Sequence, residues 1–515
     1  MIYLIDVCAH DGAQIVTLRF GTVGYTTQPS DDPADAWFEP RIIQPGNYER
    51  YAFSQSATSG SARVGAGEII LANPDGALDH LLDYAFDGYQ LTIYGLSSFD
   101  APWASRTVMF VGTIEQAEFT WKRVVLRIRD RLAELDEPIQ TTDYAGTTIA
   151  GGMDEAEGRP EDVKDRPKPL LYGVGKNLPA VAANMFDHIY EVASNGVASV
   201  DAVYDRGVAL TASGVYPDLA ALRAASIASG NYAVCLSPAY VRLGSRPAGQ
   251  ITVDATEGTS SADRSAASIA RRILEAQGFV AGDDFDAASF DALHLKNPAP
   301  VGLWTGTDEM TILQALNLIL GSIGGYIVPD RLGMMHVGRI ELPSAAPVVR
   351  LDRALILDQE GGVERAATGD QGAGVPAHKV SVNYAYNHAV SDANQLAGGA
   401  EESFVAFAGE EWRSVSAEDP AVKDRHQLAV ALTFDTLLAA EDDAEAEAQR
   451  RLALYSQRRD LFRVHIKSEF VSAVDLGRTI ELAIDRFGLS AGKHFLCTGM
   501  EEDFERGTTI LEVYG

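Results

Sequence analysis

The sequence predicts a mainly β protein with mixed α/β parts, divided into several domains. Three observations support this fold class. Short segments near both ends of the chain alternate apolar and polar residues at a period of two, which is typical of strands with one buried face. Helical spacing of apolar residues is concentrated in the second half of the chain. The length of 515 residues exceeds what one hydrophobic core holds, since domains usually contain roughly 100–200 residues.

Residues 1–140 are expected to form the first β domain. Strands are predicted at residues 2–7 and 15–20, separated by a polar turn. The run Asn73-Pro74-Asp75-Gly76 has proline and glycine at the positions that a type I turn favours. Further short strands are predicted at residues 108–114, 118–121 and 124–128.

The middle of the chain changes composition twice. Residues 141–170 are polar and rich in glycine and proline, which predicts a linker or a loop laid over the surface. Residues 171–255 hold short strand-like pieces and one helix, and they predict a small mixed, β-rich module. Residues 256–344 predict a helical α+β domain, with one helix ending at Gly278 and a second stopped by Gly324-Gly325.

Residues 345–515 return to β structure and are expected to form the last domain. A helix is predicted from Glu441 onward, because its acidic residues come first and its arginines later, as the helix dipole favours. The final segment, residues 478–515, reads as three strands joined by polar turns. In its first strand Ile480, Leu482 and Ile484 alternate with polar residues.

Composition is that of a folded globular protein with a strong negative charge. Apolar residues make up 46% of the chain, and 72 acidic residues against 42 basic ones give a formal net charge of −30. Such a chain repels phosphate backbones, so specific nucleic-acid binding is not expected. The charge is explained either by solubility or by an acidic surface that meets a basic partner or lines a negative channel.

The cysteines and the N-terminus indicate folding in a reducing cytoplasm. Cys8, Cys235 and Cys497 are far apart and odd in number, which argues against a disulfide framework and a structural zinc site. The start of the chain lacks the basic and apolar regions of a signal peptide. No run of about 18 apolar residues is present, so no membrane segment is expected.

No constellation of residues predicts catalysis. The ten histidines are scattered, and no two lie one helical turn apart. The acidic runs at residues 283–291 and 441–447 lack calcium-loop spacing and are interpreted as a solvated loop and a helix N-terminus. The run YSQRRDLFR is the one basic stretch interleaved with aromatics, and it is interpreted as a helix end. We therefore assign no catalytic, cofactor-binding or metal residue, expect no cofactor, and expect that the protein is not an enzyme.

Three parts of the chain carry a family resemblance. They are SGSARVGAGEIILANPDGALDHLLDYAFDGYQLTIYG; GTIEQAEFTWKRVVLRIRDRLAELDEPIQTTDYAG with DRPKPLLYG and VASVDAVYDRGVAL; and RFGLSAGKHFLCTGMEEDFERGTTILEVYG. Together they resemble tail proteins of long-tailed bacteriophages and of phage-like elements. Within that group, the length of the chain and the order of these segments resemble those of the tail hub, a baseplate-hub-like structural protein at the tip of the tail.

The resemblance implies an architecture and a set of partners. Two β-barrel-like domains that resemble tail-tube modules would come from residues 1–140 and 345–515, with mixed α/β domains between them. Three copies would form a ring that caps or continues the tail tube, with DNA passing through an acidic lumen. The implied partners are the distal tail protein, the tape measure protein and tail fibre or tip proteins. The implied location is the virion tail tip, after synthesis and assembly in the host bacterial cytoplasm.

Other functions fit parts of the same sequence. One alternative is a hexameric distal tail protein, in which residues 171–255 would be the added module. Another is a tail-associated glycan-cleaving protein, although the repetitive β-helix pattern common in depolymerases is missing. A third is a glycan-binding protein whose exposed aromatics would be Tyr204, Tyr216 and Tyr232, residues that also fit half-buried strand positions.

Overall fold

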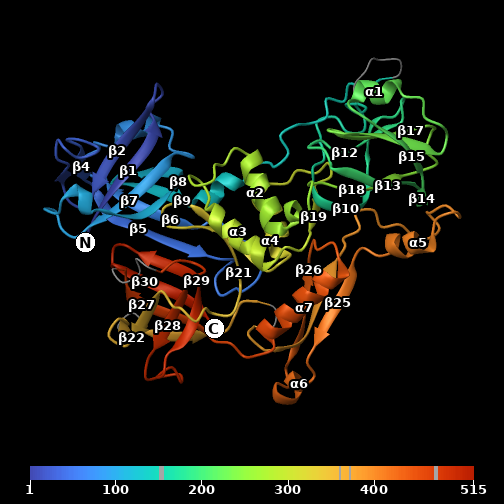
Figure 1. The fold of residues 1–515 in the computed structure, drawn as a ribbon. Coiled ribbons are helices and arrows are strands. Elements are labelled where there is room, and N and C mark those ends of the chain that lie inside the picture. Colours follow the sequence, from blue (N-terminus) through green and yellow to red (C-terminus); the bar gives the residue numbers. More distant parts are fainter. Residues whose placement is uncertain (150–155, 359–360, 371–372, 469–473) are drawn as a thin grey trace.

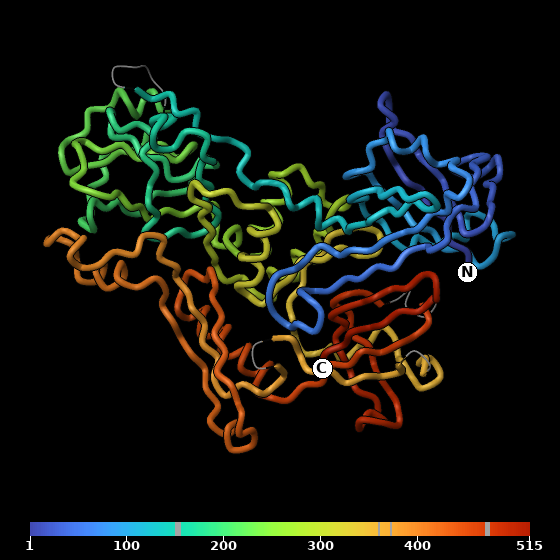
Figure 2. The backbone as a smooth tube through the Cα atoms, turned by 180° about the vertical axis from the view of Figure 1, so that it is seen from behind, coloured from blue at the N-terminus to red at the C-terminus, as the bar shows by residue number. Residues whose placement is uncertain are grey.

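The computed structural model describes residues 1–149, 156–358, 361–370, 373–468 and 474–515 (Figure 1). Two β lobes, formed by the two ends of the chain, lie side by side in both views (Figures 1 and 2). A helical centre connects them to a separate β module and to an extended arm. The mainly β prediction with mixed α/β parts is confirmed.

The two lobes share one 15-stranded sheet. Its N-terminal strands are β1 (Ile2–His10), β2 (Ile15–Gly21), β3 (Tyr25–Thr26), β4 (Trp37–Pro40), β5 (Ile42–Tyr51), β6 (Ala66–Ala72), β7 (Gln90–Leu96), β8 (Thr107–Thr120) and β9 (Arg123–Arg129). Its C-terminal strands are β22 (Val349–Asp352), β23 (Val363–Ala366), β27 (Leu461–Lys467), β28 (Thr479–Ala483), β29 (Lys493–Asp503) and β30 (Thr508–Tyr514). Among the described residues no sheet closes on itself. The lobes are therefore joined open sheets rather than two separate closed barrels.

Alternation of apolar residues explains the strands of both lobes. In β9 Val124, Leu126 and Ile128 point into the N-terminal core, and in β27 Phe462, Val464 and Ile466 point into the C-terminal core. The two strands expected at residues 108–114 and 118–121 are one strand, β8, whose register shifts between Ile114 and Gln116. Short 3₁₀ turns complete the lobe and lead out of it: η1 (Asp79–Asp83), η2 (Trp103–Ser105) and η3 (Arg131–Leu135).

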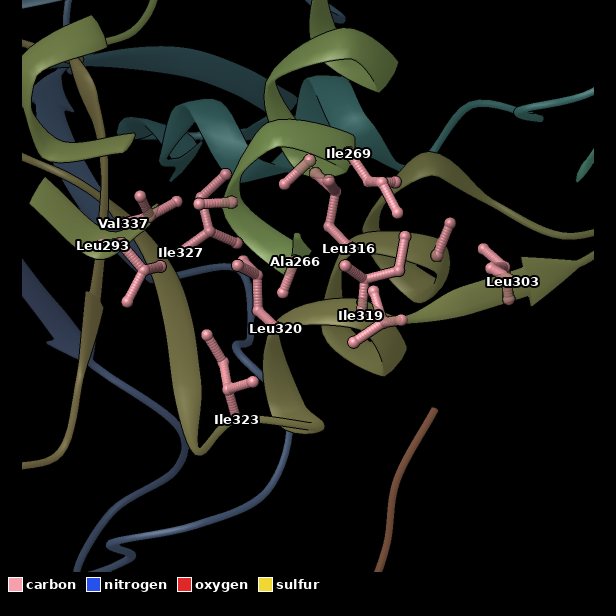
Figure 3. Packing of buried hydrophobic residues seen from close by; sticks show 14 of the residues in the cluster. Ala266, Ile269, Leu293, Leu303, Leu316, Ile319, Leu320, Ile323, Ile327 and Val337 are labelled. Carbon is pink, nitrogen blue, oxygen red and sulfur yellow. The ribbon is translucent and has the colours of Figure 1, made fainter. Parts of the chain in front are cut away.

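The helical centre packs α2 (Ala266–Ala276), preceded by η4 (Ala262–Arg264), against α3 (Ala287–Lys296) and α4 (Ile312–Gly321). The hairpin of β20 (Gly325–Pro329) and β21 (Met335–Arg339) closes the core. Side-chain caps start each helix, at Ser265, at Asp286 and at Thr311, whose capping box includes Gln314. Figure 3 shows the aliphatic side chains that meet there, among them Ile269, Leu316 and Leu320.

The β module consists of two five-stranded sheets. The first contains β14 (Val208–Ala209), β13 (Ser199–Asp205), β18 (Ile251–Thr256), β10 (Leu171–Pro179) and β19 (Gly302–Trp304). The second contains β11 (Val181–Asn184), β12 (Ile189–Ala193), β17 (Ala239–Leu243), β16 (Asn231–Leu236) and β15 (Thr211–Tyr216), with α1 (Leu219–Ala224) beside it. The described part of 141–170 packs on this module, since Tyr144 is buried in the core against Ile189 and Tyr240.

The arm comprises residues 377–455. Its sheet has the order β25 (Arg413–Glu418), β24 (Ala377–Tyr384) and β26 (Val430–Asp435), and α7 (Glu441–Tyr455) packs on β24 and β25. The connections between its strands carry α5 (Glu402–Ala408) and α6 (Ala421–Arg425). The domain boundaries remain a prediction, but within residues 345–515 this arm is a sheet separate from the C-terminal lobe.

The acidic run at residues 441–447 forms the start of α7, as expected, but its last carboxylate is buried. Glu447 lies on the buried face of the helix with 2% of its surface exposed. Its carboxylate bonds Arg451 Nε at 2.6 Å and both Arg450 Nε and Nη2, at 2.8 and 2.7 Å. Arg450 also donates to the carbonyl of Ile340, and Arg451 to that of Gly321. Burial acts to raise the pKa of Glu447, but the two guanidinium groups outweigh it and hold this pKa below its usual value.

We expect the Glu447→Ala substitution to destabilise the attachment of the arm. Removing one partner of a buried ionic cluster leaves two guanidinium groups without their counter-charge, at a cost of about 3–5 kcal/mol. Urea unfolding followed by circular dichroism measures the loss. The exposed Glu445→Ala change on the same helix is the control and should cost under about 0.5 kcal/mol. Equal losses in both variants would contradict the ionic role.

Candidate functional site

The junction between the two lobes is formed by β5 and β29. The strands pair antiparallel, with Arg50 opposite Met500 and Glu49 opposite Glu501. The ladder continues past the strands, because Ala52 N donates to Thr498 O and Phe504 N to Gly46 O. Gly46 has a φ of +129°, and β5 changes register at this point. This irregularity lies where the pairing of β5 with β29 begins, while β5 pairs with β6 along its other edge.

Arg50 is buried in the junction and contacts three parts of the chain. Only 2% of its surface is exposed. Its Nη1 lies 3.0 Å from Asp475 Oδ1 and donates to the carbonyl of Pro329 at 2.9 Å. Nη2 lies 3.7 Å from the sulfur of Met500. Burial opposes the charge, but Asp475 and neighbouring acidic groups outweigh it and raise the pKa of Arg50 above its usual value. A permanent cation thus ties the N-terminal lobe to the centre and to the C-terminal lobe.

A second buried polar group continues the junction inward. Asp130 accepts hydrogen bonds from the Tyr48 hydroxyl at 3.1 Å and from Gly65 N at 2.9 Å with Oδ2, and from Leu132 N at 3.0 Å with Oδ1. Burial raises the pKa of Asp130 to about 6, although all three hydrogen bonds act to lower it. Burial also raises the pKa of Glu502. The junction therefore holds one carboxyl group, that of Asp130, whose charge changes as pH passes through about 6.

The outer face of the junction is a shallow acidic groove of about 650 Å³. Glu49, Glu68, Glu501 and Asp503 line it, together with Arg127, Arg506 and His465. Arg463 bonds both carboxylate oxygens of Glu501, at 2.7 and 2.8 Å, and Arg127 pairs with Glu118 beside the groove. The carboxylates that line the groove still outnumber its arginines. Acidic residues from both lobes therefore lie together on this face.

Two histidines of the described residues lie in polar clusters. Ser265 Oγ lies 2.7 Å from His294 Nδ1, but this serine is fully buried and caps α2 by accepting from Ser268 N. His336 lies between Asp330 and Asp286 in a cavity of about 500 Å³, and its hydrogen bond to Asp330 raises its pKa. In the described part of the chain, no three potential ligand side chains come together to hold a metal ion.

The remaining predicted features separate into packing and surface roles. All three cysteines are free, with Cys235 and Cys497 buried and Cys8 half-buried. Tyr232 is buried, so it does not offer an exposed aromatic surface for a glycan. Tyr204 stacks on Phe404 of the arm with 4.3 Å between ring centroids. Over the described ranges, no helix is both long and apolar enough to cross a membrane.

Sequence reasoning missed the junction residues. No motif surrounds Arg50 or Asp475, and the strands that meet there are some 450 residues apart. One signal was present. In β5, Tyr48 and Arg50 occupy inward positions while Asn47 and Glu49 point outward, so the period of two places an arginine on the buried face.

No family model and no curated protein matches the chain. The fold is similar to several solved structures. A tail protein from Neisseria meningitidis MC58 is 10% identical with a TM-score of 0.39, and the 43 kDa tail protein of prophage MuSo2 from Shewanella oneidensis is 9% identical with a TM-score of 0.37. Each match covers all of this chain and 96% of the other. A chain of a native gene transfer agent virion is 14% identical with a TM-score of 0.42, over 68% of this chain and 85% of that one.

We expect Arg50→Met to loosen the contact between the lobes. The change keeps most of the side-chain volume but leaves the Asp475 carboxylate and the Pro329 carbonyl without their donor, at a cost of about 3–5 kcal/mol. Urea unfolding measures the cost. The control is Arg123→Met at the exposed first position of β9, which should change stability by under about 0.5 kcal/mol. A loss below about 1 kcal/mol at Arg50 would show that β pairing alone holds the junction.

We expect Asp130 to make stability fall as pH rises. Its pKa is raised from an ordinary value near 3.8 to about 6 in the folded protein. Its contribution is therefore fully present below about pH 4 and is lost as pH rises through 6. Relative to Asp130→Asn, the wild type should lose about 2–3 kcal/mol between pH 4 and pH 7. Parallel urea-stability profiles of the two proteins over this range would contradict the shifted titration.

Proposed function

We propose that this chain is a structural protein of a phage-like tail, and within the tail the hub at its tip. The hub would form a ring that caps or continues the tail tube and connects it to distal tail, tape measure and fibre components. The proposal starts from the sequence resemblance to phage tail proteins. The solved structures with similar folds include proteins described as tail proteins, the same class.

The observation that carries the proposal is the pair of β lobes held together by β5 and β29. A threefold ring of such chains presents six β lobes, two from each copy. That arrangement fits a sixfold tube without six copies of the protein. Ring closure by identical contacts is the usual outcome of symmetric assembly.

The charge of the chain suits a ring through which DNA passes. A net charge of −30 repels phosphate, so DNA would slide along such a surface without binding it. The acidic groove over the lobe junction contributes residues from both lobes to one face. A hub needs no catalytic group, and penetration and receptor binding would then belong to other chains.

The second candidate is a distal tail protein that forms a hexameric ring. The observation that favours it is the β module, whose two five-stranded sheets stand apart from the lobes in Figure 1. In a hexamer, one lobe of each copy would be enough to match the sixfold tube. The second lobe of each copy would then have no contact with the tube to make. We therefore prefer the hub.

Native mass spectrometry and negative-stain class averages of the purified chain test the proposal. We expect a trimer with a central hole, alone or when added to tails. A sixfold ring would favour the distal tail protein. If the chain were absent from purified tails, or cleaved peptidoglycan or capsule in a turbidity assay, the structural role would be wrong.

A further inference from the structure

The arm carries an acidic cluster at one end and borders a basic cavity at the other. Its three strands separate the connection that carries α5 from the connection that carries α6. Figures 1 and 2 both show these two connections at opposite ends of the arm. Strands of six residues span roughly 20 Å, so the two ends of one copy do not reach each other.

Near α6 the arm borders a basic cavity of about 530 Å³, whose other walls are residues 365–368, 373–376 and 458–459. Four arginines line it, namely Arg365, Arg425, Arg458 and Arg459, together with His426, and no carboxylate is among the described residues that line it. Asp460 neutralises Arg365 at 2.6 Å, whereas Arg425 and Arg458 form no ion pair with the described residues. Leu428, with 80% of its surface exposed, adds an apolar rim. Arg458 and Arg459 belong to the basic run YSQRRDLFR, in which α7 ends at Tyr455 as expected.

The end that carries α5 is acidic. Glu401, Glu402, Glu410 and Glu411 are exposed, and none of them pairs with a lysine or arginine side chain in the described ranges. Helix α5, which lies between these two pairs of glutamates, is anchored by contacts with the rest of the arm and with the module. Asn387 Nδ2 donates to the carbonyl of Ala408 at 3.0 Å, and Phe404 stacks on Tyr204 of the module. The carboxylates are therefore presented on an ordered support.

We infer that the arm makes a head-to-tail contact between copies of this chain, with the α5 end of one copy seated in the basic cavity of the next. Charge complementarity within one sequence carries the inference. Each copy offers one acidic cluster and one basic cavity. A contact between two copies therefore leaves one acidic cluster and one basic cavity free for further copies. Repetition of such a contact either closes a ring or extends a filament. The inference rests on the proposed function for the choice of a ring.

A protein partner suits this cavity better than a nucleic acid. The net charge of −30 opposes the approach of a polyanion, while a short acidic segment of a folded chain brings few charges. Arginine beside exposed leucine is also the composition of protein interfaces, where guanidinium groups pair with carboxylates around an apolar contact. The next copy supplies such a segment.

Charge reversal at each end tests the contact. The basic-end variant is Arg425→Glu with Arg458→Glu, and the acidic-end variant is Glu401→Lys with Glu402→Lys. Each should raise the dissociation constant of self-association at least tenfold, measured by sedimentation at low salt. The quadruple variant that combines all four substitutions should regain association. Lys122→Glu with Arg123→Glu, on the exposed β8–β9 turn, is the matched control and should leave association unchanged. Circular dichroism melts identify any variant that fails to fold.

Two results would overturn the contact. The first is that neither the basic-end nor the acidic-end variant changes self-association. The second is that the quadruple variant associates as weakly as the two variants that change one end. If the wild type assembles only on tails, the same variants are compared by the amount incorporated into tails. A ring that forms regardless of these charges would leave the hub proposal intact and remove only this contact. Absence of the wild-type chain from tails would instead remove the hub proposal.

Discussion

The fold depends on the pairing of β5 with β29 and on the buried arginine at its centre. These strands come from opposite ends of the chain, and their hydrogen bonds convert two lobes into one continuous sheet. Arg50 adds a charge that must be satisfied in the interior, and it finds Asp475 and the Pro329 carbonyl there. A buried cation without these partners is costly, so the three segments that supply them are held in one arrangement. The lobes therefore keep a defined spacing.

Buried polar groups, charged or neutral, recur where other parts of the chain meet. Glu447 and its two arginines attach α7 to the carbonyl end of α4, and Asn177 of the module bonds the side chain of Asn387 in the arm at 2.8 Å. Such contacts have strict geometry and are weak unless every partner is present. They specify how the parts are oriented, while the apolar cores of the lobes, centre and module supply most of the stability.

Much of the local structure could be predicted from the sequence. Helices α2 and α4 follow from their apolar spacing and their caps, and α7 follows from its acidic start and later arginines. The terminal strands follow from their alternation. The joining of the lobes could not be predicted, because strand pairing over some 450 residues leaves no local pattern. Glu447 and Arg50 were missed as buried groups. Both occupy positions that the helical or strand period assigns to the interior. The period therefore indicated burial, but charged residues are normally expected at the surface.

The candidate surfaces were harder still to predict. Acidic residues are spread along the whole sequence, and only the fold brings Glu49 and Glu68 of one lobe next to Glu501 of the other. The basic cavity likewise unites Arg365, Arg425 and Arg458 from three separate segments. Net charge indicated a function in repelling or meeting charged partners, but its distribution is a property of the folded chain.

Hydrogen–deuterium exchange at β5 and β29 tests most directly whether the two lobes are one unit. If they are, the amides of residues 47–51 and 499–503 exchange at the same slow rate, and Arg50→Met accelerates both together. If the C-terminal lobe opens while residues 47–51 remain protected, the lobes are independent, and the junction does not set their spacing.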